Sequence, residues 1–176
     1  MSEVKTNKVS PSTGTAFTLG DSGDTFTLPS GATLTVSGTS TIASLGASTA
    51  SGTLSMADNI VSRPVVKDYG ETVNAIGAIG GGTQDIDLES GNVVTGTVDT
   101  STTTFTFSNP PTTGTAGSFT LILTNGGSQT VNWPSAVDWA ASTAPTLTAS
   151  GVDAITFTTI DAGTIWYGFA AGLAMG

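Results

Sequence analysis

The stretch from Gly114 to Trp139, GTAGSFTLILTNGGSQTVNWPSAVDW, most constrains the fold of this chain. Its first half alternates small polar residues with apolar ones, which is the period of a β-strand. The alternating apolar residues are Phe119, Leu121 and Leu123. Because Ile122 adds an apolar residue on the opposite face, we expect this strand inside a sandwich or against another subunit, not at a wet edge.

A turn signal follows this strand, because Asn-Gly pairs favour tight reversals. Asn125-Gly126-Gly127 supplies the signal, and Val131–Trp133 then runs apolar again until Pro134. The pattern predicts a central β-hairpin on which the other strands pack.

Further strand-like segments continue through the C-terminal two-thirds, with turn signals about every 10 residues. Ser90-Gly91 and Asp161-Ala162-Gly163 predict the turns of two more hairpins. Val65-Val66 and Val73 to Ile79 fit a first strand, although residues 71–76 also fit one short helical turn. Together they predict an all-β domain, an antiparallel β-sandwich of the jelly-roll type. The additional strand-like segments are Gln84–Glu89, Asn92–Val98, Thr102–Ser108, Thr146–Thr148, Ala154–Ile160 and Thr164–Ala170.

The N-terminal third has a different pattern. Residues 1–15 are polar and predict an extended arm, and residues 16–56 contain short units with two apolar residues each, separated by glycine turns. Such small units need to stack on one another or on neighbouring chains, so we expect a short β-stalk. The predicted organisation is an arm and stalk over residues 1–62, a linker over 63–70 that begins at Arg63-Pro64, and the sandwich over 71–176.

Charge is distributed unevenly along the chain. The net charge is −9, and all four basic residues precede residue 68, whereas residues 68–176 carry nine acids. Such a surface repels phosphate backbones, so nucleic acid is not expected as a partner. Charged residues make up only 10% of the chain, compared with about 25% in ordinary soluble domains, so we expect copies of the chain to cover one another as a homotrimer.

The residue types needed for most catalysis are missing. The chain contains no His and no Cys, which removes the usual general base, the commonest metal ligand and any thiolate. The remaining lysines lie in the predicted arm and linker, where desolvation to a catalytic pKa is not expected. The sequence therefore predicts a non-enzymatic protein without a cofactor.

Two acidic patterns suggest a cation site and are better explained otherwise. Asp85, Asp87 and Glu89 alternate along one predicted strand, but a sheet face presents carboxylates too divergently for one ion, so we interpret them as a solvated face. Asp21-Ser22-Gly23-Asp24 resembles part of a calcium loop but lacks the later bidentate Glu, so a hairpin turn is the better interpretation. No metal site is predicted.

The aromatic residues suggest a surface for sugars. Three tryptophans and Tyr167 could stack on sugar rings, although packing in the core is the more common role of such residues. We expect Trp166 and Phe169 to be core residues of one alternating strand. Trp139, beside Asp138 in a loop of small residues, is the best candidate for an exposed contact with a host surface glycan.

Neither a signal peptide nor a membrane span is expected. No apolar run approaches the roughly 18 residues that cross a bilayer. Residues 1–5, MSEVK, lack the apolar centre of a signal peptide.

Two long stretches resemble virion structural proteins of marine and freshwater bacteriophages, the tail-fibre-like family. The first is VKTNKVSPSTGTAFTLGDSGDTFTLPSGATLTVSGT, and the second runs from KDYGETVNAIG through TFTFSNPPTTGTAGSFTLILTNGGSQTVNWPSAVDW to TIWYGFAAG. Together they cover nearly the whole chain, and LGDSGDT, TFTFSNPP and FTLILTNGG are the most distinctive blocks. The resemblance implies a β-rich, trimeric, non-enzymatic component located in the virion, and it transfers no catalytic residue.

Two roles are consistent with this resemblance. One is a tail-fibre-like or tail-associated protein exposed on the particle, with the tail and a host glycan as partners. The other is a capsid decoration (cement) protein that binds the major capsid protein through its N-terminal arm. In both roles we expect residues 1–62, with Lys5 and Lys8, to attach the protein to the particle.

Overall fold

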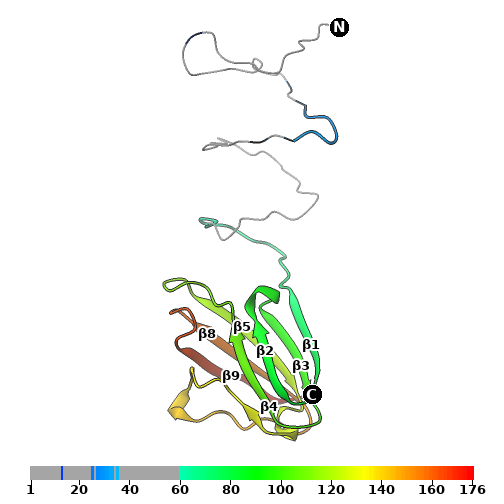
Figure 1. Cartoon of the computed structure of the whole chain (residues 1–176), viewed down its shortest axis with the longest axis vertical. Helices are drawn as coiled ribbons and strands as arrows, with labels where there is room; N and C mark the ends of the chain where they lie inside the picture. The colour runs from blue at the N-terminus through cyan, green and yellow to red at the C-terminus, as the bar shows by residue number, and fades with distance from the viewer. Residues whose placement is uncertain (1–12, 14–24, 26, 34, 36–59) are drawn as a thin grey trace. The chain divides into compact units, whose positions relative to one another are not determined.

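A computed structural model describes residues 13, 25, 27–33, 35 and 60–176 of the chain (Figure 1). The chain divides into two units, Met1–Val61 and Ser62–Gly176. Most of the predicted arm and β-stalk, including Lys5, Lys8 and the Asp21–Asp24 turn, lies outside the described residues. The account below therefore concerns the second unit.

The second unit consists of short strands connected by loops and single 3-10 turns. The segment Val73–Ile79 is a strand, so the alternative of a short helical turn over residues 71–76 was wrong. The strands are β1 (Val73–Ile79), β2 (Gly82–Asp87), β3 (Val93–Val98), β4 (Thr103–Ser108), β5 (Gly117–Thr124), β6 (Val131–Asn132), β7 (Val137–Trp139), β8 (Val152–Thr159) and β9 (Trp166–Met175). The 3-10 turns are η1 (Leu88–Ser90), η2 (Gly126–Ser128) and η3 (Ala140–Ser142).

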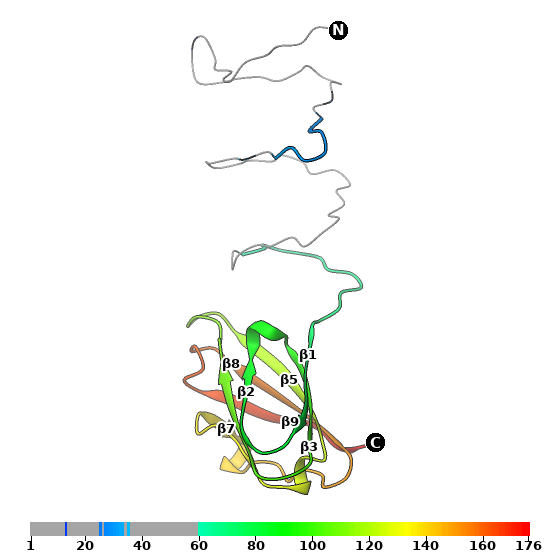
Figure 2. The same ribbon diagram turned by 45° about the vertical axis from the view of Figure 1, so that its right-hand side comes forward.

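The strands form two sheets. The larger sheet has six strands in the order β1-β3-β5-β8-β9-β7, and the smaller has three in the order β2-β4-β6. In Figures 1 and 2 the small sheet lies over one face of the large one. The prediction of a β-rich fold is therefore confirmed.

The first six strands alternate between the two sheets. Strands β1, β3 and β5 lie side by side in the large sheet, and the strands that follow each of them, β2, β4 and β6, lie side by side in the small one. The chain thus winds three times around the space between the sheets. Partners in the large sheet lie 20 and then 27 residues apart, as Val73 pairs with Val93 and Val93 with Thr120.

The prediction of antiparallel pairing was wrong for most of the domain. After one full winding the chain returns to the same sheet and runs in the same direction as before. The β1-β3, β3-β5, β2-β4 and β4-β6 pairs are therefore parallel. Strand β7 is also parallel to β9. Only β5-β8 and β8-β9 are antiparallel among the described strand pairs.

Two of the three predicted hairpins do not form, although their turn residues do reverse the chain. After β5, residues Gly126–Ser128 form η2, and the next strand, β6, joins β4 in the small sheet instead of pairing with β5. After β2, the chain likewise crosses to the large sheet at Gly91, whose φ is 144°. A side-chain carbon on Gly91 would lie 2.5 Å from the backbone oxygen of Thr72, so glycine is required where the chain passes beside β1.

The end of the chain closes the large sheet. The third predicted hairpin is confirmed, because β8 and β9 pair antiparallel on either side of Asp161-Ala162-Gly163. The prediction that the Phe119–Leu123 strand is not an edge strand is also confirmed, because β5 is flanked by β3 and β8.

One core lies between the two sheets. Aromatic rings join the sheets, as Phe107 of β4 meets Phe119 of β5 at 4.9 Å between ring centres and Phe157 of β8 at 5.0 Å. Burial of these side chains is the main source of stability for a domain that cannot form an ion pair after Lys67. The buried apolar residues are Ile79, Ile86, Val94, Val98, Phe105, Phe119, Leu121, Leu123, Ile155, Phe157 and Trp166.

Candidate functional site

An open pocket lies where the short edge strand β7 ends beside the long strand β9. Strand β7 pairs only with Trp166, Tyr167 and Gly168, so β9 continues past its neighbour from Phe169 onward. The space beside this step has a volume of about 190 Å³. Its lining residues are Asp138, Trp139, Ala140, Tyr167, Gly168 and Phe169.

The exposed side chains of this pocket combine a carboxylate with two aromatic rings. Asp138 and Tyr167 are directly paired across β7 and β9, so both point away from the core. Phe169 follows on the same face of β9 and is 54% exposed, and Tyr167 is 38% exposed. Asp138 is exposed and makes no hydrogen bond or ion pair with the described residues.

This arrangement is rich in groups that attract positive charge. The carboxylate attracts a cation directly, and the faces of Tyr and Phe rings attract it through their quadrupoles. The side-chain hydrogen-bond donors in the lining are the Tyr167 hydroxyl and the indole N–H of Trp139. An uncharged sugar needs several donors and acceptors around its hydroxyl groups, so the pocket is better suited to a cation with an apolar stem.

Trp139 is half-buried and lines the pocket, so it is less exposed than we expected. Its ring packs against the core, 5.4 Å from the ring of Trp133 and 5.6 Å from that of Phe157. It also covers Gly168, where a side-chain carbon would lie 2.6 Å from the Trp139 ring. Trp139 therefore supports the pocket from the inner side of the sheet, and the exposed rings belong to Tyr167 and Phe169.

The sequence contained a signal for these residues that we misread. Trp166 and Phe169 were both assigned to the core, but residues three apart on a regular strand face opposite sides. Trp166 is 2% exposed as expected, whereas Phe169 points outward. The pairing of Asp138 with Tyr167, by contrast, depends on a parallel contact between distant strands and has no local signal.

The three alternating acids do not share one strand face. Asp85 and Asp87 lie on β2 and point outward, but Glu89 lies in η1. Asp85 accepts hydrogen bonds from the hydroxyls of Thr106 and Ser108 on β4. Asp87 accepts a bond from the Asn109 side chain and another from the Glu89 amide, and these bonds lower the pKa of Asp87 from its ordinary value. Both carboxylates therefore accept hydrogen bonds from other residues of the same domain.

Two other carboxylates hold loops in place. Burial of Asp153 opposes its ionisation, but bonds from the hydroxyl and amide of Thr148 and from the amide of Ala174 outweigh it and lower its pKa. Asp161 accepts bonds from the Ile165 amide and the Thr159 hydroxyl, which lower its pKa as well. Both groups have structural roles that their sequence contexts did not indicate.

Within residues 60–176 and the few described residues before them, no three acidic, histidine or cysteine side chains gather as metal ligands. In the same part of the chain the only helices are three-residue turns, so none is long enough to cross a membrane. Comparison of the chain with protein-family models, with curated proteins and with solved structures found no match.

Proposed function

We propose that this chain is a non-enzymatic structural component of a bacteriophage virion, a trimeric tail-fibre-like or tail-associated protein exposed on the particle. The proposal starts from the resemblance of its sequence to that family. The observation that carries it further is the outer face of the large sheet, which has the composition of a surface covered in an assembly.

The six strands of the large sheet contain two charged side chains, Asp138 and Asp153, and Asp153 is buried. The outward positions are otherwise apolar or are small hydroxyl residues, and they include Phe169 and Ile122. Free monomers seldom expose wide surfaces with so little charge. Contact with further copies of the chain would remove this surface from water, which supports a homotrimer.

The segment that precedes β1 supports assembly as well. Val65 and Val66 are 98% and 61% exposed, and Tyr69 is 69% exposed. Exposed apolar side chains in an extended segment gain stability when they lie on a partner. Exposed apolar side chains next to residues 1–62 are consistent with attachment to the particle through those residues, including Lys5 and Lys8, while the β-domain faces outward.

The same segment favours one alternative, a capsid decoration protein. An extended apolar segment can lie in a groove between capsid subunits as readily as on another copy of the chain. In that role the major capsid protein would cover Val65 and Val66, and the β-domain would project from the head.

Two measurements test these proposals. Light scattering of the purified chain should report about 52 kDa, three times its mass of 17.4 kDa. A monomer at micromolar concentration would contradict the trimer. Counting copies in purified particles by quantitative mass spectrometry should give a few tens or fewer for a tail protein, whereas hundreds would assign the chain to the head.

A further inference from the structure

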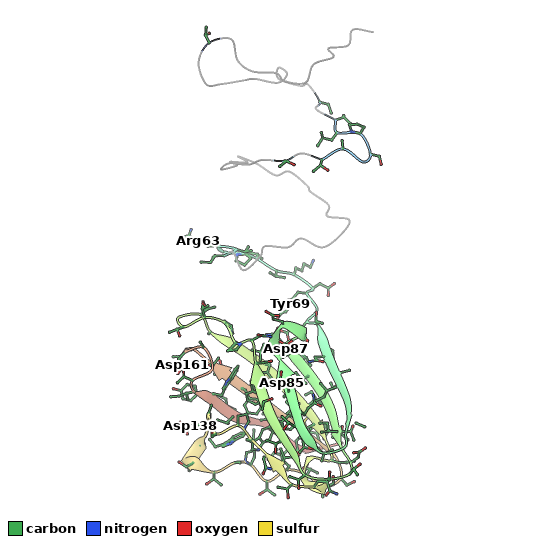
Figure 3. The ribbon with its side chains drawn as sticks, in the orientation of Figure 1. Arg63, Tyr69, Asp85, Asp87, Asp138 and Asp161 are labelled. Carbon is green, nitrogen blue, oxygen red and sulfur yellow. The ribbon has the colours of Figure 1, made fainter. Side chains whose placement is uncertain are left out.

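Two basic residues and one exposed carboxylate lie on different parts of the described structure. The last basic residues are Arg63 and Lys67, and both are exposed in the extended segment before β1. Asp138 is the one exposed carboxylate on the strands of the large sheet, and it lies beside Tyr167 and Phe169. Figure 3 shows Arg63 in the segment that precedes the domain and Asp138 on the flank of the domain.

We infer that the segment Ser62–Tyr69 of one copy lies on the outer face of the large sheet of a second copy, with Arg63 in the pocket beside Asp138. This inference rests on the proposed trimer and names the contact that holds it together. We assign the contact to a second copy because the two surfaces are complementary. The segment exposes apolar side chains and a cation, and the sheet exposes apolar side chains and one carboxylate without a partner among the described residues.

The apolar parts match first. Val65 and Val66, two and three residues after Arg63, are 98% and 61% exposed, and the outer face of the large sheet offers apolar and threonine side chains with Asp138 as its one charge. Placing one on the other removes both from water, which is favourable in proportion to the apolar area buried.

The charged parts match as well. A guanidinium can stack on aromatic rings while its N–H groups bind a carboxylate, which is the combination that Phe169, Tyr167 and Asp138 present. Lysine carries a compact, strongly hydrated charge that stacks less well, so Arg63 is the better occupant than Lys67. Asp138 would then gain the partner that it lacks among the described residues.

The contact also explains how assembly stops at a small number of copies. The segment of one copy and the sheet of the next are different surfaces, so the contact is head-to-tail, and such contacts close into rings when the rotation between copies allows it. In a closed ring of three, each copy gives one segment and receives one.

The test exchanges the two charges in the full-length chain. Arg63→Asp and Asp138→Arg alone each place like charges together, so the concentration at which trimers dissociate should rise by at least about tenfold for each variant. The double variant restores an opposite pair and should return to within about threefold of the wild type, because neighbouring sites couple. Light scattering over a dilution series measures this concentration, and circular dichroism checks that each variant is folded.

Two variants serve as matched controls. Asp99→Arg makes the same change of charge as Asp138→Arg at an exposed site after β3, where the carboxylate accepts a bond only from Thr100. Lys67→Asp makes the same change of charge as Arg63→Asp, at the other basic residue of the segment. Both should shift the dissociation concentration by less than about threefold.

The possible outcomes distinguish the proposed contact from the proposed trimer on which it rests. A wild-type chain that is monomeric at all concentrations removes the trimer and this contact together. A wild-type trimer that is unaffected by Asp138→Arg, or a double variant as weak as the single ones, overturns the contact and leaves the trimer standing. A loss of trimer with Lys67→Asp but not with Arg63→Asp also overturns it.

Discussion

The outer faces of the two sheets differ in how their polar groups are satisfied. On the small sheet, Asp85 accepts bonds from Thr106 and Ser108, and Asn132 donates to the Thr104 hydroxyl, so the face is polar and bonded within itself. On the large sheet, the outward charge is Asp138 alone, and its exposed neighbours are aromatic. One face is suited to contact with water and the other to contact with protein.

This difference shows that a single core can support two surfaces of opposite character. On each sheet, the outward residues alternate with residues that are buried in the shared core, since each strand directs every second side chain inward. The inner positions therefore determine the fold, whereas the outer positions are free to be polar on one sheet and, in the proposed trimer, to contact another copy on the other. The variants below test that division, from the largest expected effect to the smallest.

The central strand β5 of the large sheet should carry more of the stability than the short strand β6 of the small sheet. Leu121→Ala on β5 empties a fully buried position and should cost roughly 2–5 kcal/mol of unfolding free energy through lost transfer energy and the cavity left behind. Val131→Ala on the two-residue strand β6 removes a half-buried side chain and should cost about 1 kcal/mol. Urea denaturation of both variants gives the comparison, and equal losses would contradict it.

A buried carboxylate should matter far more than an exposed one. Asp153→Ala removes the acceptor of the Thr148 amide and one of the two acceptors of the Ala174 amide, at a carboxylate that is fully buried, and it should cost about 3 kcal/mol. The effect should appear in thermal unfolding as a lower melting temperature. A Tm within about 1 °C of the wild type would show that these amides find other partners.

The same carboxylate makes stability depend on acid. Because the pKa of Asp153 is lowered in the folded state, its contribution is fully present above the unfolded value of about 3.9 and is lost as pH falls through the lower folded value. Neutralising the other acids relieves repulsion and acts in the opposite direction. The difference in Tm between the wild type and Asp153→Asn should therefore be constant above about pH 5 and shrink as the pH falls below about 3.9. A difference that does not change with pH would contradict this role.

The polar face should tolerate loss of its charges. Replacing Asp85 and Asp87 by Asn and Glu89 by Gln removes charge–dipole bonds but also removes repulsion in a region without bases, so unfolding free energy should change by less than about 1 kcal/mol. Calcium should not raise the melting temperature of the wild type. A rise on adding calcium that the triple variant lacks would indicate a cation site that we have missed.

The smallest effect concerns one hydroxyl under the small sheet. Thr103 is buried, and its hydroxyl oxygen has no hydrogen-bond partner among the described residues. Thr103→Val keeps the shape and removes the unsatisfied group, so stability should rise by about 0.5–1 kcal/mol. A loss of stability on denaturation would indicate that a water molecule binds there.

Local pattern predicted the elements better than their connections. The β8–β9 hairpin and the interior position of β5 followed from Asp161-Ala162-Gly163 and from Ile122, because a short turn and a two-sided apolar strand are local properties. The winding did not follow, because Ser90-Gly91 marks a reversal equally well within a sheet and between sheets. Its direction depends on which distant strand is available as a partner, and no local pattern records that.

The candidate site was only partly visible for the same reason. Asp138 and Trp139 stood out in the sequence, and strict alternation from Trp166 would have placed Tyr167 and Phe169 outside. Their meeting requires that Val137–Trp139 add to the edge of β9, which is a contact across 29 residues. The side chains could be identified from the sequence, but their grouping could not.

The winding also sets the order in which a newly synthesised chain can fold. Strands β1 to β4 find their partners within Val73–Ser108, so they can pair soon after that stretch leaves the ribosome. Strand β9 emerges last, yet it supplies Trp166 to the core and holds β7 and β8 on its two sides. A chain that stops before Trp166 therefore exposes an open strand edge and part of the core, which are the features that favour aggregation. Only a chain that includes β9 can close the domain.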